Sequence, residues 1–351
     1  MRFFGSLPEG DAAEITLSGP GGMEARILSL GAALRSLKVP CADGHMRDIV
    51  LGYDTAEEYR NGSAYFGATV GRVCNRIGGA SFELDGRIWR LDANEGSNQL
   101  HGGTAGFSHR IWTPIVLGEA EALFRLESPD GEMGFPGNVS AEVRYCLTED
   151  ALSIRYRAQS DRNTLLSLTN HTYFNLAGHD SGPVTEHFLQ AAADFYTPTG
   201  PGLIPTGEIL PVEGSWLDLR EPRRIGDLLE SPEGQASGGL DHNFVLRAGR
   251  EIRAVLAAPD RSLSLEVLTD RPGMQIYTAG GLSNEKGKSG AVYGKYQAVC
   301  LETQDFPDAV HHPGFPSAVL KAGKLWESET VYRIRGTVKK PRSRKGIIIR
   351  V

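Results

Sequence analysis

The stretch SAEVRYCLTEDALSIRYRAQS, residues 140–160, alternates apolar and polar side chains almost without interruption. Successive side chains of a strand point to opposite faces of a sheet, so this alternation predicts two half-buried strands. Similar runs recur along the chain, with no rhythm of strands alternating with long helices. We expect further antiparallel strands within residues 25–39, 122–129, 253–260, 262–270 and 331–338.

Turn residues separate these runs. The chain contains 43 glycines and 19 prolines, which supply the positive and the fixed φ values that short turns need. Reversals are predicted at four dipeptides, which are Asp85-Gly86, Asp130-Gly131, Ala248-Gly249 and Pro272-Gly273.

Helical segments are few. We expect one at residues 55–60, with Asp54 as a possible N-cap, and one at residues 225–230. Neither an internal repeat nor a Ser- or Pro-rich linker divides the chain. These features predict an all-β fold with one domain over residues 1–337. The basic segment 338–351 is interpreted as a solvated tail, with a membrane- or RNA-contacting arm as the weaker alternative.

Composition and charge exclude several classes of protein. The 351 residues are 40% hydrophobic and 23% charged, as in an ordinary globular chain, and the net charge of −6 disfavours nucleic-acid binding. The four cysteines lie far apart, so neither a zinc knuckle nor a disulfide framework is indicated. Pro8, Glu9 and Asp11 interrupt the N-terminal segment, and no apolar stretch of 18 residues follows. We expect a cytoplasmic protein without a membrane partner.

Three motifs suggest chemistry that their spacing does not support. GLSNEKGKSG, residues 281–290, resembles a phosphate-binding loop, but Leu282 occupies the position of its first glycine. Neither a dinucleotide-binding G-x-G-x-x-G nor a G-x-S-x-G nucleophile motif is present. His311 and His312 are adjacent, so on a strand they would point to opposite faces and would not easily bind one metal. No metal or cofactor site is predicted.

Polar and ionisable residues gather in five segments that are otherwise apolar or rich in glycine. These segments are Phe66–Phe82, Ser97–Gly103, Leu168–His179, Asp241–Leu246 and Leu301–Gly323. They resemble the galactose mutarotase (aldose 1-epimerase) family. Arg72 and Asn75-Arg76 match its G-R-x-x-N-R-I pattern, His101 its N-x-L-H-G-G, His171 its N-H-T/S-Y-F-N-L, Asp241 its D-H-N-F, and Glu302 its L-E-T-Q-x-x-P-D-A.

The resemblance implies a large antiparallel β-sandwich, called a supersandwich, that interconverts the α and β anomers of free hexoses without a cofactor. Mutarotation requires a proton to leave the anomeric hydroxyl while another reaches the ring oxygen, so one base and one acid suffice. By resemblance, Glu302 is the base and His171 the acid, and rotation about C1–C2 precedes reclosure. From the residues alone, His171 could instead be a core histidine and Glu302 a surface charge. The apolar run at residues 298–301 nevertheless predicts a buried strand before Glu302.

Six further residues are predicted to contact the sugar. His101 precedes Gly102-Gly103, which permit close backbone approach. The alternatives for Arg76 and Asp241 are an ion pair with a nearby acid and a turn cap, respectively. The resemblance assigns sugar contacts or positioning to His101, Arg76, Asn75, Asp241, Gln275 and Tyr173.

Other functions stay open at this point. A sugar-binding module without turnover would not require a base opposite an acid. An enzyme for a hexose phosphate or an unusual sugar would need extra Arg or Lys at the rim, and the sequence does not orient the candidates Arg72, Arg110 and Lys295. Cys74 and His311 depart from the family pattern. The preferred aldose and the oligomeric state, monomer or homodimer, are undetermined. We expect Glu302 and His171 to face each other across a space the size of a pyranose ring.

Overall fold

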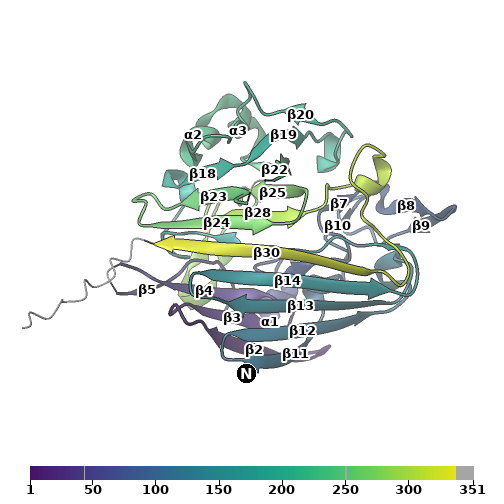
Figure 1. Cartoon of the computed structure of the whole chain (residues 1–351), viewed down its shortest axis with the longest axis horizontal. Helices are drawn as coiled ribbons and strands as arrows, with labels where there is room; N and C mark the ends of the chain where they lie inside the picture. The colour runs from purple at the N-terminus through teal and green to yellow at the C-terminus, as the bar shows by residue number, and fades with distance from the viewer. Residues whose placement is uncertain (43, 250, 337–351) are drawn as a thin grey trace, which may run out of the picture.

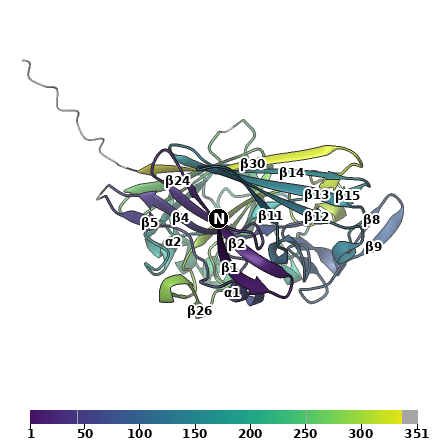
Figure 2. The same cartoon turned by 90° about the horizontal axis from the view of Figure 1, so that it is seen from below.

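Two large antiparallel sheets carry most of the fold (Figure 1). The computed structural model describes residues 1–42, 44–249 and 251–336, so the predicted basic tail lies outside the described residues. The all-β prediction is confirmed. Seen from below, β30, β14 and β13 form one side of the molecule, and β1, α1 and β26 lie on the opposite side (Figure 2).

Residues 140–160 form the centre of the larger sheet. They fold as β13 and β14, which pair in an unbroken register from Val139↔Ser160 to Leu147↔Leu152. Their apolar side chains are buried and the alternating polar ones are mostly exposed, as the sequence pattern predicts. Within the described residues the sheet runs β11 (Thr113–Gly118), β12 (Glu121–Ser128), β13 (Val139–Leu147), β14 (Ala151–Ser160), β30 (Leu325–Gly336), β24 (Leu263–Thr269), β23 (Ala254–Ala257), β18 (Phe188–Ala191) and β21 (Arg223–Arg224).

A six-stranded sheet contributes to the same core. Tyr145 and Tyr332 from the larger sheet share one buried apolar cluster with Phe174, Met274 and Leu301 from the smaller one. Because one face of each sheet is apolar, packing the two faces together removes both from water. The smaller sheet runs β17 (Tyr173–Phe174), β28 (Val299–Gln304), β25 (Gly273–Tyr277), β22 (Asp241–Leu246), β19 (Ala193–Thr197) and β20 (Leu210–Pro211).

A five-stranded sheet and short ribbons complete the described β structure. The N-terminal sheet runs β1 (Arg2–Leu7), β2 (Gly10–Ser18), β3 (Glu24–Leu28), β4 (Leu34–Pro40) and β5 (Met46–Asp48). The ribbons pair β6 (Thr69–Val70) with β16 (Thr169–Asn170), β7 (Arg76–Ile77) with β10 (Gln99–Leu100), β8 (Ser81–Leu84) with β9 (Arg87–Arg90), β15 (Thr164–Leu165) with β29 (Val319–Leu320), and β26 (Glu285–Lys286) with β27 (Val292–Tyr293).

The helices are short, as predicted, but one cap was wrong. Helix α1 (Ala56–Asn61) is capped by Thr55, whose hydroxyl accepts from the Glu58 N–H while the Glu58 carboxylate accepts from the Thr55 N–H. Asp54 instead accepts one hydrogen bond from Arg35 and one from the Ser289 N–H. Helix α2 (Ile225–Glu230) lies where expected, and α3 (Pro232–Ser237) was not predicted. No helix among the described residues is long and apolar enough to span a bilayer.

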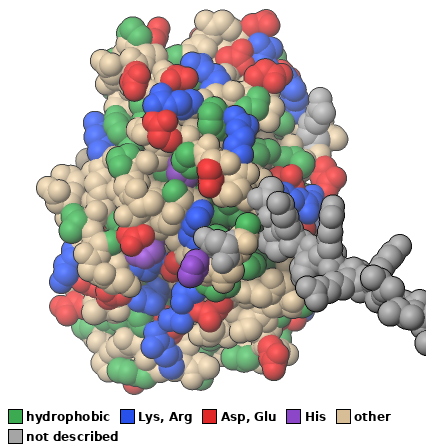
Figure 3. Space-filling view, turned by 90° about the vertical axis from the view of Figure 1, so that its left-hand side faces the viewer, with side chains coloured by type: hydrophobic (Ala, Val, Ile, Leu, Met, Phe, Trp, Pro, Cys, Tyr) green, Lys and Arg blue, Asp and Glu red, His purple; other side chains and the backbone are tan. Residues whose placement is uncertain are grey.

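Two boundaries also differ from the prediction. Strand β30 begins at Leu325, six residues before the predicted run, because its inward side chains there include Ser328 and Thr330, which are buried but carry no apolar signal. Gly273 begins β25 rather than forming a reversal. A Cβ at this position would lie 2.6 Å from Asn243 Oδ1 and 3.0 Å from the Phe306 ring, so close packing rather than a turn requires the glycine. On the face shown in Figure 3, acidic and basic side chains are interspersed.

Candidate active site

The register of the smaller sheet aligns the predicted base with a predicted positioning residue. Glu302 on β28 pairs with Gln275 on β25, which in turn pairs with Asn243 on β22. Cross-strand partners share a face of the sheet. Strand β28 is buried along its whole length, so its alternate residues Val299, Leu301 and Thr303 lie on the core face and Cys300, Glu302 and Gln304 on the opposite one. The predicted burial of this strand is confirmed.

The neighbouring row of the same sheet aligns two more predicted residues. Cys300, two positions before Glu302, pairs with both Tyr173 and Tyr277, and Tyr277 pairs with Asp241. Strand register therefore places Tyr173, Asp241, Gln275 and Glu302 on one face, although they are far apart in the sequence.

Short connections next to the ribbons supply the histidines. His171 follows β16; its N–H donates to the Ala68 carbonyl and its carbonyl accepts from the Gly67 N–H. His101 follows β10 and adopts a φ of +51°. A Cβ on the next residue, Gly102, would lie 1.9 Å from the Gly71 oxygen, so this turn admits only glycine there.

A backbone contact determines which nitrogen of His101 carries the proton. Its Nδ1 accepts a hydrogen bond of 3.2 Å from the Asn75 N–H. Burial lowers the pKa of His101 well below its usual value, which leaves the ring neutral. A neutral imidazole that accepts at Nδ1 carries its proton on Nε2, so His101 offers a ligand an N–H donor.

All eight predicted site residues line one cavity of about 160 Å³. It opens beside the smaller sheet, where the histidine turns meet the strands. Four of its residues were not predicted, and their types, an aromatic, an aliphatic or a hydroxyl on a turn or strand, carry no signal that separates them from core residues. The wall comprises Asn75, Arg76, His101, His171, Tyr173, Asp241, Gln275 and Glu302, together with Ser63, Tyr65, Leu100 and Tyr277.

The histidine and the carboxylate lie closer together than we predicted. His171 Nε2 is 3.6 Å from Glu302 Oε1, so no pyranose ring fits between them. The expectation of a ring-sized gap was wrong, because the two oxygens that exchange protons in a sugar hemiacetal share one carbon and lie side by side. Glu302 Oε2 and His171 Nδ1 are buried without a hydrogen-bond partner. The pair can therefore present two proton-exchanging atoms to neighbouring oxygens of one ligand.

Burial shifts both members of this pair toward their neutral forms. It lowers the pKa of His171 to about 4 and raises the pKa of Glu302 well above its usual value. The half-buried Asp241 carboxylate raises the pKa of Glu302 further by charge repulsion. Both shifts favour a protonated carboxyl and a neutral imidazole over the charged forms of the two groups.

Arg76 and Asp241 show how the polar wall is held. Arg76 donates two hydrogen bonds of 2.7 Å to Glu95, so the alternative of an ion pair with a nearby acid is correct, yet Arg76 also lines the cavity. Asp241 begins β22 rather than capping a turn, and its Oδ1 accepts from Gln275 Nε2 at 2.7 Å. Burial raises the pKa of Asp241, and the Gln275 hydrogen bond partly offsets this rise.

The structure orients the candidate phosphate-binding cations away from the cavity. Arg72 is buried and donates to Ser128, and Arg110 is ion-paired with Glu132. Lys295 lies over the Tyr296 ring, 5.1 Å from its centroid. Arg76 is thus the single cation in the described part of the cavity wall.

The two departures from the family pattern lie outside the cavity wall. Cys74 is buried with its Sγ 3.3 Å from Ser167 Oγ, and His311 contacts the buried Asp308 carboxylate at 2.6 Å. Asp308 in turn accepts from the Gly78 N–H, just beyond Arg76. His311 is thus linked to the cavity wall through Asp308 and the backbone that follows Arg76.

Three of the cavity residues could be considered as metal ligands. Atoms of His101, His171 and Glu302 all lie within 4.8 Å of one another. A metal would require a lone pair on each ligand atom. The His101 Nδ1 lone pair already accepts from Asn75, and its Nε2 carries the proton. This tautomer does not fit a metal site.

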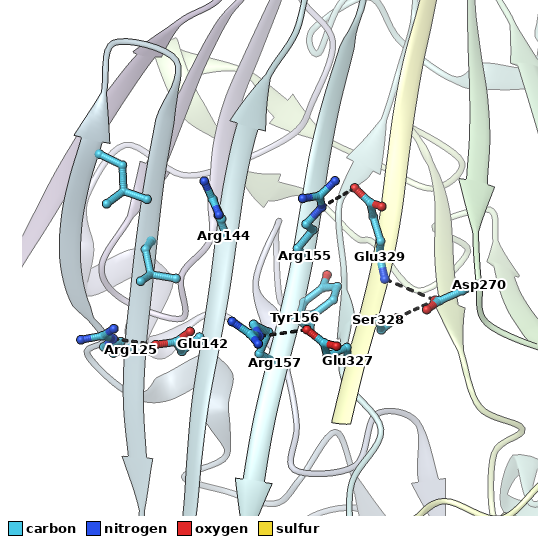
Figure 4. Close-up of a pocket in the computed structure, with 12 residues that line it drawn as sticks. Arg125, Glu142, Arg144, Arg155, Tyr156, Arg157, Asp270, Glu327, Ser328 and Glu329 are labelled. Atoms are coloured by element: carbon cyan, nitrogen blue, oxygen red, sulfur yellow. Dashed lines mark hydrogen bonds and ion pairs between the residues drawn. The ribbon is translucent and has the colours of Figure 1, made fainter. Parts of the chain in front are cut away.

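Some hollows in the described structure are larger than this cavity but are lined by different groups. One of about 590 Å³ lies on the outer face of the nine-stranded sheet (Figure 4). There Arg125 pairs with Glu142, and Arg155 with Glu329, each at 2.7 Å across neighbouring strands. In these cross-strand pairs each charge already has a partner of opposite sign, so the pairs give a substrate little to gain by contacting them.

Comparison with known proteins places the chain in a family. The family model for aldose 1-epimerase matches residues 13–333. A galactose mutarotase of Bos taurus is 43% identical over 88% of this chain and 90% of its own length. An aldose 1-epimerase of Escherichia coli is 36% identical, over 91% of this chain and 94% of its own.

Solved structures agree with this assignment. A GalM/aldose epimerase homologue from C. elegans superposes with a TM-score of 0.86 at 29% identity, covering 93% of this chain and 99% of its own. A galactose 1-epimerase from Lactobacillus acidophilus gives a TM-score of 0.83 at 28% identity, covering 95% and 97%. Family model, curated relatives and fold all coincide: the chain belongs to the aldose 1-epimerase family.

Proposed function

We propose that the protein interconverts the α and β anomers of free aldohexoses such as glucose and galactose. Glu302 acts as the base on the C1 hydroxyl, and His171 as the acid on the ring oxygen. The observation that carries this proposal is the 3.6 Å approach of two buried groups within a cavity of about 160 Å³. The names of the relatives, galactose mutarotase and aldose 1-epimerase, support the same reaction.

Ring opening transfers two protons and breaks one bond. Ionised Glu302 removes the proton of the C1 hydroxyl, and protonated His171 donates a proton to the ring oxygen. The electron pair of the O–H bond forms the carbonyl C1=O1 while the C1–O5 pair stays on the ring oxygen. This step ends with a protonated carboxyl and a neutral imidazole, which are the forms that burial favours.

Reclosure on the other face of C1 completes the reaction. After rotation about C1–C2, neutral His171 removes the proton of the O5 hydroxyl, which attacks C1, and Glu302 returns its proton to O1. The pair thus uses its two protonation states in turn, one for opening and one for closing. The bound sugar must stabilise the charged state before opening, and its hydroxyl groups can supply the missing hydrogen bonds to Glu302.

The remaining wall residues bind and orient the sugar in this proposal. His101 donates its Nε2–H, Arg76 and Asn75 donate to hydroxyl oxygens, and Asp241 accepts from hydroxyl groups. Gln275 keeps Asp241 in place through their 2.7 Å hydrogen bond. Tyr173 supplies an aromatic ring beside the sugar.

No cofactor enters these steps, and a reducing compartment such as the cytoplasm is part of the proposal. The four cysteines are all unpaired, and two of them are buried. Such thiols persist where disulfides do not form. The sugar-binding module without turnover is the second hypothesis; it provides no reason to bury an acid and a base 3.6 Å apart.

Polarimetry on freshly dissolved α-D-glucose and α-D-galactose tests the proposal. The wild-type protein should accelerate the approach to the equilibrium rotation, and Glu302→Gln and His171→Asn should each abolish most of this acceleration. Glucose or galactose binding without any acceleration by the wild type would contradict the proposal and favour the binding module.

A further inference from the structure

We propose that Tyr65 is a positioning residue that fixes the orientation of the His171 ring and separates it from the water of an adjoining hollow. Tyr65 matches none of the motifs that indicated the site. The inference rests on the proposed function, because it concerns the residue to which that function assigns the acid. Its basis is the set of ring contacts around His171 and the position of Tyr65 between two cavities.

Hydrogen bonds do not orient the His171 ring. Its backbone is held on both sides, by Ala68 and Gly67, but its Nδ1 has no partner and its Nε2 lies 3.6 Å from Glu302. Rotation of an imidazole about its χ2 torsion is broad and weakly restrained by its own bonds. Neighbouring groups must therefore determine where Nε2 points.

Two tyrosine rings supply that restraint. The Tyr173 ring lies 5.1 Å from the His171 ring at an interplanar angle of 20°, and the Tyr65 ring lies 5.9 Å away at 24°. Near-parallel rings at these distances stack, so a rotated imidazole would meet the ring faces. Stacking fixes the ring without consuming either nitrogen, which leaves both free to exchange protons.

Tyr65 is itself held in an uncommon conformation. Its φ is +54°, and its carbonyl accepts from the Ala68 N–H to close a tight turn. A positive φ is rare for a bulky side chain and persists where surrounding contacts enforce it. The Tyr65 ring also contacts His101 at 4.7 Å and His109 at 5.9 Å.

The position of Tyr65 separates the sugar cavity from a larger hollow. Tyr65 and Ser63 line both the cavity of about 160 Å³ and a neighbouring hollow of about 620 Å³, whose wall also contains His109. Removing the Tyr65 ring would therefore join the two spaces. Water from the hollow could then reach the imidazole of His171, which is now buried.

This separation has a measurable electrostatic consequence. Burial is the main cause that lowers the pKa of His171 to about 4, so hydration would raise it toward 6.5. The ionisable groups that face His171 are His101, Glu302, Tyr65 and Tyr173 from the elements packed against it. A tyrosine-to-phenylalanine change leaves the packing in place and removes one of these groups, which makes it the matched control.

The test compares Tyr65→Leu, which removes the ring, with Tyr65→Phe, which keeps it. NMR of histidine-labelled protein follows the His171 resonance, assigned by its loss in His171→Asn. We expect a pKa near 4 in the wild type and in Tyr65→Phe, and a rise of about one unit or more in Tyr65→Leu. The acid limb of the pH profile of kcat/KM should rise by the same amount, and kcat at pH 7 should fall by about tenfold.

Each other outcome overturns the inference. An unchanged His171 pKa and acid limb in Tyr65→Leu would mean that the ring neither positions nor shields the imidazole. Tyr65→Met serves as a second variant if Tyr65→Leu does not fold, and failure of both would make the ring a general folding support instead. Failure of the proposed function has a different signature, in which His171→Asn and Glu302→Gln retain mutarotation whatever Tyr65 does.

Discussion

The outer face of the nine-stranded sheet and the cavity at Glu302 both present ionisable side chains on strands. On the outer face these side chains are exposed and paired, whereas in the cavity Glu302 and His171 are buried and lack a full set of hydrogen-bond partners. On the outer face, Arg157 lies 2.9 Å from Glu327 on the neighbouring strand, and both are more than half exposed (Figure 4). In the cavity, the Glu302 and His171 side chains are 3% and 6% exposed, and each keeps a polar atom without a partner.

This difference shows that the size of a hollow does not identify the reactive one. Water and a paired neighbour already stabilise the outer charges, so a ligand gains little by contacting them. The buried pair has lost its water without gaining a full set of partners, which costs folding free energy. We therefore expect a sugar that supplies the missing hydrogen bonds to bind at Glu302 and His171 rather than on the outer face.

The largest expected effect comes from removing the carboxylate of the buried pair. Glu302→Gln should lower the mutarotation rate by about 10³-fold, since general base catalysis contributes roughly 10²–10⁴-fold. Polarimetry with α-D-galactose measures this loss. Glu327→Gln, the same change on the outer face, is the matched control, and equal losses in both variants would erase the contrast between the two regions.

The same variant tests the stability cost of the buried carboxyl. Its pKa is raised above the ordinary value of 4.5, so its contribution to stability is present below that pH and is lost as the pH rises toward the folded-state pKa. At pH 7 the unfolded chain ionises freely while the folded chain resists ionisation. Glu302→Gln should therefore melt at the same or a higher temperature than the wild type at pH 7 in calorimetry. A clearly lower melting temperature would contradict the assigned burial cost.

A smaller effect is expected for the acceptor on the neighbouring strand. Asp241→Asn should raise KM by about tenfold to a hundredfold, because a hydrogen bond to a charged group contributes roughly 1.5–3 kcal/mol. The change in kcat should be smaller, since Asp241 is not assigned a proton transfer. Initial rates over a range of galactose concentrations separate the two constants. An unchanged KM would remove Asp241 from the sugar-binding wall.

The pH dependence of the mutarotation rate tests whether the His171 imidazole is buried away from water. The proposed mechanism uses one proton shared by Glu302 and His171. Because burial lowers the pKa of His171 to about 4, we expect a second proton to bind only in strongly acidic solution. The rate should change by less than about twofold between pH 7 and pH 5.5, whereas an imidazole of ordinary pKa near 6.5 would cost about tenfold. A fall of that size in wild-type kcat/KM would show that the imidazole is hydrated.

The smallest effect belongs to the outer face. Arg157→Gln should change the free energy of unfolding by less than about 0.5 kcal/mol, because exposed ion pairs contribute little. Urea denaturation measures this change, and mutarotation should stay within about twofold of the wild-type rate. A loss of several kcal/mol would show that the outer pairs support the sheet.

The fold was largely predictable because each long strand shows an alternation of apolar and polar residues along consecutive positions of the sequence. The alternation at residues 140–160 predicted all of β14 and all of β13 except its first residue, Val139. It did not predict the start of β30, where Ser328 and Thr330 face inward without an apolar signal. The cap of α1 was missed because both Asp54 and Thr55 suit the role, and only the carboxylate of Glu58 three residues later selects Thr55.

The candidate site was predictable where polar residues interrupt apolar segments, as Glu302 does. It was not predictable where the wall is aromatic, because Tyr65 and Tyr277 look like ordinary core residues in sequence. A register argument could have found Tyr277, which pairs with Cys300, two positions from Glu302. The Glu95 carboxylate that holds Arg76 gave no signal, since an ion pair depends on geometry that the sequence does not state.

Strand β28 has neighbours on both edges, β17 and β25, and its alternate residues belong to the core. His101, His171 and Arg76, in contrast, lie on turns and two-residue ribbons that do not enter either large sheet. Substitutions in these connections would therefore change part of the proposed sugar-binding wall without disturbing the apolar layer. The proposed base is thus held by two neighbouring strands of a large sheet, whereas the proposed acid depends on a short connection between strands.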